Sequence, residues 1–166
     1  MQVPEGGVAR GIARVPPRAA PLRDEALALG LAGAYLAPVA PEDCDAHGAM
    51  EESAIMARVS DGIGHFFQTL RNQRGEGIGG AALEYRFAFH ARPRAGDLIE
   101  VRSGLKAVGG KTFHMCHWMF DVESGRCAAT SEAVAVSFDL TARKAIEIPP
   151  ENREAMLARI VPGLCL

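Results

Sequence analysis

Several features that would place this 166-residue chain in a special class are missing from its sequence. No apolar run approaches the roughly 20 residues that a membrane-spanning helix needs. Lys and Arg number 18 against 20 Asp and Glu, so the chain lacks the basic excess typical of nucleic-acid binding. The first twenty residues carry arginines and prolines but no apolar core, unlike a secretory signal. We therefore expect a cytoplasmic globular protein with neither a membrane nor a nucleic acid as partner.

Cysteine is scarce and irregularly spaced, with four residues and no CxxC pair. In a chain without an export signal, free thiols are expected rather than a disulfide framework. Cys44 with His47, and His114 with Cys116 and His117, offer ligands that could suit zinc. However, neither set has zinc-finger spacing, and a strand would place His117 on the face opposite to His114 and Cys116. We therefore expect no metal.

The composition, 48% hydrophobic and 23% charged, is that of an ordinary globular domain. Residues 1–32 are rich in Gly, Pro, Ala and Arg without any hydrophobic period. They are expected to form an arm that is partly disordered or contains a short helix over Arg23–Leu31. Residues 33–166 are expected to form a single domain, which ends in a helix over Glu151–Ile160 after a Pro-Pro pair.

The most informative stretch runs from residue 39 to residue 70. It begins as an acidic turn, with the sequence EDCDAHG at 42–48, and continues as a helix with one apolar face. The apolar positions recur at spacings of three and four: Ile55, Val59, Ile63, Phe66 and Leu70. Asp43 and Asp45 precede the helix, where caps are expected. Gly62 and Gly64 each cost a helix roughly 1 kcal/mol relative to alanine. Close packing on a sheet, or room for a ligand chain, would explain them.

Beyond this helix the hydrophobic period changes to two, which predicts strands. The glycine-rich stretch Arg74–Gly80 lacks the flanking strand and helix of a phosphate-binding loop, so a flexible connection is expected. Strands are predicted at Ala34–Ala40, Leu83–Phe89, Ile99–Leu105, Lys111–Val122 and Arg126–Leu140, with turns at Arg92–Asp97, Gly109-Gly110 and Glu123–Gly125. Lys111–Val122 is apolar on both faces and should be central, whereas Pro38 places the first strand at an edge. The pattern predicts an α+β domain in which one helix packs on a four-strand meander. One helix leaves much of such a sheet uncovered, so we expect a dimer.

These pieces, in this order, resemble the hotdog-fold acyl-CoA thioesterases, particularly the 4-hydroxybenzoyl-CoA thioesterase class. The matching segments are DCDAHG at 43–48, YRF at 85–87, RAGD at 94–97, GGKTF at 109–113 and residues 132–140. The resemblance implies a hotdog fold, in which a curved antiparallel sheet of five or more strands wraps a long central helix. It also implies homodimers, or dimers of dimers, with acyl-CoA sites at the subunit interface. No cofactor is implied beyond the coenzyme A of the substrate.

The resemblance also implies a catalytic residue, because the second aspartate of the family's DxDxxG turn falls on Asp45. On this interpretation Asp45 attacks the thioester carbonyl or activates water, and amides around Glu51 and Glu52 form the oxyanion hole. From spacing alone, Asp43 or Asp45 would simply cap the helix. His47 could orient the acid or contact the substrate, and a partly exposed turn histidine without such a role is the alternative. Glu52, like Glu51, is a candidate base, although acids in a first helical turn commonly serve the helix dipole.

The remaining candidate residues would contact the CoA ester. They comprise residues of the turn and helix start (Asp43, Gly48, Met50 and Glu51), Thr112 for pantetheine, and basic residues for the CoA phosphates (Lys111, Arg94, Arg92 and Arg143). For the basic residues a solvated surface position is the alternative. The predicted activity is hydrolysis of acyl-CoA or acyl-carrier-protein thioesters. A non-catalytic acyl-CoA-binding protein and a hydratase that uses an Asp–His pair are the alternatives.

Overall fold

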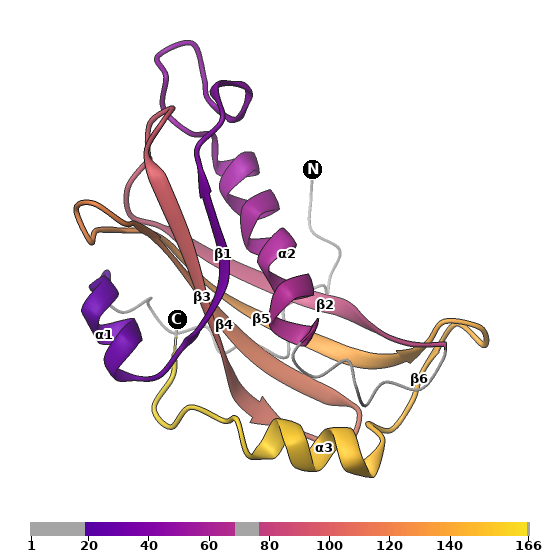
Figure 1. Ribbon diagram of the computed structural model, residues 1–166. Coiled ribbons are helices and arrows are strands. Elements are labelled where there is room, and N and C mark those ends of the chain that lie inside the picture. Colours follow the sequence, from indigo (N-terminus) through magenta and orange to yellow (C-terminus); the bar gives the residue numbers. More distant parts are fainter. Residues whose placement is uncertain (1–18, 69–76, 166) are drawn as a thin grey trace, which may run out of the picture.

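The computed structural model describes residues 19–68 and 77–165, which form one antiparallel sheet with a long helix lying on it (Figure 1). The elements, in chain order, are α1 (Arg23–Ala28), β1 (Ala32–Pro38), a 3-10 turn (Pro41–Asp43), α2 (Glu52–Gln68), β2 (Ile78–Phe89), β3 (Leu98–Val108), β4 (Thr112–Asp121), β5 (Cys127–Asp139), β6 (Lys144–Ala145) and α3 (Pro150–Leu157). The strand order is β1-β3-β4-β5-β2, and β6 pairs with β5. β4 is thus the central strand, as predicted, and β1 and β2 form the two edges.

The strand order differs from the predicted meander in the placement of β2. This strand pairs with β5, whereas β3 pairs with β1, so Arg92–Asp97 does not close a hairpin. Instead, this segment carries the chain across one end of the sheet. The prediction was wrong because alternating polarity shows which residues share a face but not which strand lies alongside. The turns at Gly109-Gly110 and Glu123–Gly125 do join neighbouring antiparallel strands, as predicted.

β2 is also longer than predicted. It begins at Ile78, so Gly79 and Gly80 belong to the strand rather than to a flexible connection; residues 74–76 of that stretch lie outside the described residues. A Cβ atom on Gly79 would lie 2.9 Å from Cδ2 of Leu140. A side chain at residue 79 would therefore require the exposed Leu140 side chain to move.

A bulge between Ala82 and Glu84 interrupts the alternation within β2. Leu83 is 61% exposed, so it is not part of the half-buried face that the pattern predicted. Tyr85, Phe87 and Phe89 share one face of β2, as the pattern predicted. Their rings stack in sequence, with centroids 5.7 Å apart between Tyr85 and Phe87 and 5.8 Å apart between Phe87 and Phe89. The edge strand therefore carries an aromatic ladder, defined by these three residues.

α2 buries the predicted apolar face against the sheet. Ile55, Val59 and Phe66 are buried, while Leu70 lies outside the described residues. A Cβ atom on Gly62 would lie 3.3 Å from Cβ of Ala34 in β1. Gly62 thus allows helix and strand to approach closely. The main core lies between α2 and strands β3, β4 and β5.

The opposite face of the sheet is covered by α1 and by the C-terminal residues. They share a core cluster with β4 and β5: Ala26, Leu31, Cys116, Trp118, Phe120, Cys127 and Leu164. Arg23 of α1 forms an ion pair with Glu100 of β3, with 2.6 Å between Nε and Oε2, and Arg102 holds the other carboxylate oxygen. α1 therefore packs onto the domain, whereas residues 1–18 of the expected arm lie outside the described part. The four cysteines all lie within the described residues, and none of them forms a disulfide.

Candidate active site

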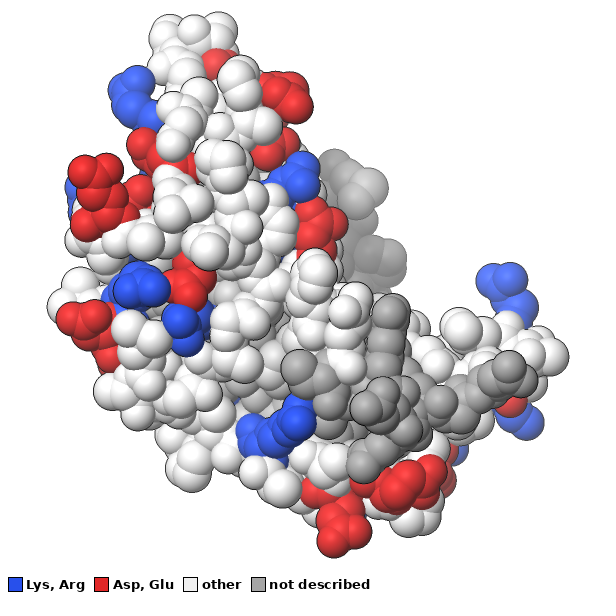
Figure 2. Space-filling model, in the orientation of Figure 1, with Lys and Arg blue, Asp and Glu red and all other residues white. Residues whose placement is uncertain are grey.

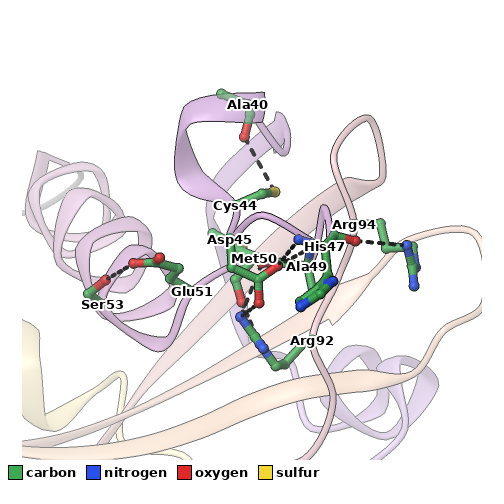
Figure 3. A network of polar contacts seen from close by, with 10 residues as sticks. All are labelled: Ala40, Cys44, Asp45, His47, Ala49, Met50, Glu51, Ser53, Arg92 and Arg94. Atoms are coloured by element: carbon green, nitrogen blue, oxygen red, sulfur yellow. Dashed lines mark hydrogen bonds and ion pairs between the residues drawn. The ribbon is translucent and has the colours of Figure 1, made fainter.

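The predicted acidic turn comes before α2, and the Asp45 carboxylate closes it (Figure 3). Oδ1 of Asp45 accepts hydrogen bonds from the main-chain amides of His47 (2.9 Å) and Ala49 (3.1 Å). Gly48 has a φ of +73°, which glycine adopts without strain. Asp45 therefore organises its own turn and does not cap α2, whose first residue is Glu52.

Arg92 joins this turn to the start of α2. Its Nη2 atom lies 2.8 Å from Oδ2 of Asp45 and 3.1 Å from the carbonyl oxygen of Ala49, and its Nε donates to the carbonyl of Met50 (2.9 Å). One guanidinium group thus touches the carboxylate and the last residues before the helix. The Asp45 side chain is 25% exposed and that of Arg92 is 43% exposed, so a ligand can reach both.

These contacts favour the ionised form of Asp45. Its pKa lies below the ordinary value chiefly because the amides of Ala49 and His47 stabilise the anion. Burial opposes this effect, and the hydrogen bond and the charge of Arg92 each lower the pKa less than either amide does. A nucleophile or general base must be unprotonated to act, and Asp45 meets this requirement at neutral pH. In this conformation, however, both of its oxygens are engaged.

Asp43, predicted to bind substrate, is held by α2. Arg58 clamps its carboxylate, with Nε 3.2 Å from Oδ2 and Nη2 3.3 Å from Oδ1, and also pairs with Asp61. The Asp43 carbonyl accepts the amide of Glu51 (2.9 Å). Asp43 therefore braces the turn against the helix, and the Glu51 amide, expected in an oxyanion hole, is already paired.

The start of α2 still offers free donors. The Glu51 carbonyl accepts the amide of Ile55, which begins the helical hydrogen-bond pattern. The amides of Glu52 and Ser53 therefore precede the first intrahelical donor and are available to an anion. Both side chains are exposed. Met50 is fully buried in the main core, so only its backbone lies at the site.

The other predicted binding residues fall into two places. Arg94 lies at the turn, where Nη1 donates to the His47 carbonyl (3.3 Å). Lys111 and Thr112 lie at the opposite end of the sheet, because the Asp121 end of β4 is the one level with the turn. Ten residues of strand separate the two ends, or about 30 Å. A single chain therefore does not bring Lys111 and Thr112 to Asp45.

Charges of both signs surround the site. Figure 2 shows basic and acidic side chains interspersed over the visible face, with no extended patch of either sign. Of the residues proposed for CoA phosphates, Arg92 and Arg94 already bind the turn. Lys111 has a carboxylate neighbour, since its Nζ lies 4.0 Å from Oε1 of Glu147. The structural role of Arg92 was not foreseen, because no local motif links it to Asp45.

The two candidate zinc sets are not assembled. His117 faces α2, with Nδ1 2.8 Å from Oγ of Ser103, whereas Cys116 is buried in the cluster on the other face of the sheet. In the described ranges 19–68 and 77–165, no three His, Cys, Asp or Glu side chains are grouped to hold a metal ion. Nor does the described part contain a helix that is long and apolar enough to cross a membrane.

A long helix on one curved antiparallel sheet, entered through an acidic turn, defines a protein of the hotdog class. The family model of the thioesterase-like superfamily matches residues 39–157, well over half of the chain. The chain therefore belongs to the thioesterase-like superfamily. This confirms the predicted family, the hotdog fold and the enzyme class, a thioester hydrolase. A search of curated proteins gave no match.

Solved structures share the fold at low sequence identity. The 1,4-dihydroxy-2-naphthoyl-CoA thioesterase Slr0204 from Synechocystis has a TM-score of 0.64 at 18% identity, over 74% of this chain and 93% of that one. SAV2348 from Staphylococcus aureus, solved in complex with CoA, has a TM-score of 0.69 at 17% identity. The match covers 82% of this chain and 90% of that one. The 12:0-ACP thioesterase from Umbellularia californica has a TM-score of 0.68 at 13% identity. The match covers 80% of this chain and 51% of that one.

Proposed function

We propose that this protein hydrolyses acyl-CoA or acyl-carrier-protein thioesters, with Asp45 as the reacting carboxylate. The observation that carries the proposal is an ionised, partly exposed carboxylate in the turn that leads into the central helix, in a chain of the thioesterase-like superfamily. The names of the similar proteins support the substrate class: one acts on an acyl-CoA, one binds CoA, and one acts on an acyl carrier protein.

Asp45 can act in either of two ways. As a nucleophile, Oδ2 attacks the thioester carbon, the C–S bond breaks, and water then hydrolyses the acyl-aspartate and regenerates the carboxylate. As a general base, Oδ2 takes a proton from water, the resulting hydroxide attacks the same carbon, and the proton passes to the leaving thiolate. In both cases Arg92 must release Oδ2, which its exposed position allows. In this proposal the amides of Glu52 and Ser53 hold the carbonyl oxygen as negative charge develops.

His47 supports this chemistry through its backbone. Its amide donates to Oδ1 of Asp45, and its carbonyl accepts from Arg94. The turn residues thus fix the orientation of the carboxylate, whichever of its two roles applies. No cofactor takes part in the proposed reaction, and coenzyme A enters only as part of the substrate.

We expect the protein to act as a homodimer joined through β2. This strand is twelve residues long, has β5 on one side only, and exposes Leu83, Tyr85 and Phe89. A long apolar edge of this kind invites a further strand. If two copies of β2 pair antiparallel about a two-fold axis near Leu83, the Phe89 end of each copy lies beside the Ile78 end of the other. Thr112 of the second copy lies two strands inward from that Ile78 end, so this pairing brings it closer to the Asp45 turn of the first copy than Thr112 of the same chain is.

Replacement of Asp45 by asparagine tests the assignment. The amide side chain of this variant would retain an oxygen for the two turn amides but would have neither charge nor basicity. Release of free thiol is measured over a series of aliphatic and aromatic acyl-CoAs, for the parent, Asp45→Asn and the control Asp61→Asn. We expect kcat/KM to fall on the order of a hundredfold or more in Asp45→Asn and to stay at the parental value in the control. Equal activity in all three proteins would restrict Asp45 to a structural role.

The engagement of both Asp45 oxygens supports a second candidate, a non-catalytic acyl-CoA-binding protein. Such a protein would bind CoA esters but release no thiol from any of them. A hydratase is less well supported, because the contact between His47 and Asp45 is made by the main-chain amide and not by the imidazole ring. Loss of absorbance from an enoyl-CoA without thiol release would identify that activity.

A further inference from the structure

The two glycines of α2 stand in opposite environments. Gly62 is pressed against β1, where a Cβ atom would lie 3.3 Å from the Ala34 side chain. At Gly64 a Cβ atom would meet no heavy atom within 4 Å. Glycine destabilises a helix interior relative to alanine. Close packing against β1 explains the presence of glycine at position 62 but not at position 64. At Gly64 the sequence leaves space unfilled, although alanine would fit and would strengthen the helix.

The space at Gly64 belongs to a groove of about 260 Å³ between the C-terminal half of α2 and strands β2, β4 and β5. Its sides are made largely of residues with little or no side chain. These are Gly64 of α2, Gly80 and Ala82 of β2, and Ala133 and Ala135 of β5. An ordinary aliphatic side chain at any of these positions would reduce the groove. The size of the groove therefore depends on small residues from three elements.

The interior of the groove is apolar and uncharged. Ile63, Phe67 and Met115 contribute hydrocarbon or aromatic surface. Its two polar side chains are already paired, since Ser60 Oγ donates to the Met56 carbonyl (3.0 Å) and Tyr85 is hydrogen-bonded to Ser60. Burial raises the pKa of Tyr85, so its hydroxyl stays neutral. The hydroxyl hydrogens of both side chains are thus engaged within the protein, so a carboxylate of a ligand would lose its hydration and gain no donor from them.

We propose that this groove holds the acyl chain of the substrate, that the substrates are thioesters of unbranched aliphatic acids, and that Gly64 sets the accepted chain length. At the packing density of protein interiors a methylene group takes roughly 25–30 Å³, so the groove accommodates about eight to ten carbons. This inference rests on the proposed thioester hydrolysis and adds the class of acyl group. Acids with a carboxylate at the far end are rejected, because the groove lining contains no charged side chain and the hydrogens of its two hydroxyls are engaged elsewhere.

The position of the groove fits a chain that starts at the catalytic turn. Ser60 is eight residues beyond Glu52, so the groove begins about 12 Å along the helix from its start. The aromatic ladder spans this interval on β2, from Phe89, three residues before Arg92, to Tyr85 at the groove. A flexible alkyl chain can follow these stacked rings into the groove, whereas a short acyl group ends before it.

Gly64→Leu tests the proposal, and His65→Leu is its matched control. Both variants add leucine to the same helical turn, but residue 65 does not line the groove. kcat/KM is measured by thiol release with butyryl-CoA and decanoyl-CoA, and the affinity for the non-hydrolysable thioether S-decyl-CoA is measured by calorimetry. Each buried methylene contributes roughly fourfold, and leucine fills the room of about four carbons. We therefore expect Gly64→Leu to lose on the order of a hundredfold with decanoyl-CoA and S-decyl-CoA, while butyryl-CoA hydrolysis is unchanged. His65→Leu should match the parent throughout.

The two readouts separate this inference from the proposed function. If the parent releases no thiol but binds S-decyl-CoA in a Gly64-dependent way, the chain site stands and the hydrolysis proposal falls. If the parent is active and Gly64→Leu keeps the parental preference between decanoyl-CoA and butyryl-CoA, the chain site is wrong. A changed molar mass of Gly64→Leu in light scattering, with unchanged S-decyl-CoA affinity, would also overturn it, because the groove would then be a contact between copies.

Discussion

His117 gives a quantitative test of the structure, because it is a histidine enclosed in the core. It lies in β4 on the side that faces α2 and is fully buried, with Nδ1 bonded to Ser103 Oγ. Its Nε2 atom, and Oγ of Ser131 in the same row of the sheet, have no hydrogen-bond partner among the described residues. Burial lowers the pKa of His117 from 6.5 to about 4. The replacement His117→Gln keeps a group that can bond Ser103 but does not titrate.

The sign and size of the pH effect follow from these two pKa values. The folded state holds His117 neutral down to about pH 4, whereas the unfolded chain takes up a proton near pH 6.5. Stability is therefore unaffected above pH 6.5 and is lost as the pH falls from there towards 4. By linkage this single group lowers the free energy of unfolding by about 1.3 kcal/mol between pH 7.5 and 5.5, and by about 2.5 kcal/mol between pH 7.5 and 4.5.

Urea unfolding at a fixed protein concentration measures this difference. Trp118, the only tryptophan, is buried beside His117 in β4 and reports the loss of the core by fluorescence. We expect the free energy of unfolding of the parent to fall more steeply with acid than that of His117→Gln, by the amounts given above. Other titrating groups, including His90, whose pKa is also lowered by burial, are shared by both proteins and cancel. Parallel pH curves for the two proteins would refute the buried, neutral placement of His117.

Three further predictions concern packing, the carboxylate and the edge strand. Gly62→Ala should lower the melting temperature in calorimetry, despite the better helix propensity of alanine, because its methyl group would press on β1. Arg92→Gln should move the acidic limb of the kcat/KM pH profile to higher pH, but only partway to the pKa of an ordinary aspartate, because the amides of Ala49 and His47 still stabilise the Asp45 anion. An unchanged limb would show that Arg92 does not lower the pKa of Asp45. Leu83→Lys should yield monomers in light scattering. Leu36 is 63% exposed on the opposite edge strand, so Leu36→Lys should leave the dimer intact. Dimers in both variants would place the interface elsewhere.

The features that follow from local chemistry could be predicted from the sequence. The apolar face of α2, the glycine turn between β3 and β4, and the central position of β4 each depend on periodicity or on one turn. The edge position of β1 followed from Pro38, which has no amide to donate to a neighbouring strand. In these cases the nearest residues in the chain are also those that determine the structure.

The features that depend on distant partners could not be predicted in this way. The two glycines of α2 are indistinguishable in sequence, each being a break in a helical pattern. Only the position of Ala34, nearly thirty residues earlier in the chain, separates the one that packs from the one that leaves room. Likewise, the bulge that exposes Leu83 depends on pairing with β5 and leaves no mark in the alternation of β2.

The environment of Asp45 depends on the same strand order that the sequence did not reveal. Because β2 and β3 are not neighbours, the connection between them crosses the end of the sheet and pairs with the turn: the Met50 amide donates to the Pro93 carbonyl (2.7 Å) and the Ala95 amide to that of Gly48 (3.2 Å). This crossing brings Arg92 onto the carboxylate. A hairpin at the same residues would have kept that guanidinium with its own strands. The guanidinium contact of the catalytic candidate is thus a consequence of topology, whereas the amides that contribute most to its lowered pKa belong to the turn itself. A DxDxxG turn therefore identifies the carboxylate but not its contact with Arg92.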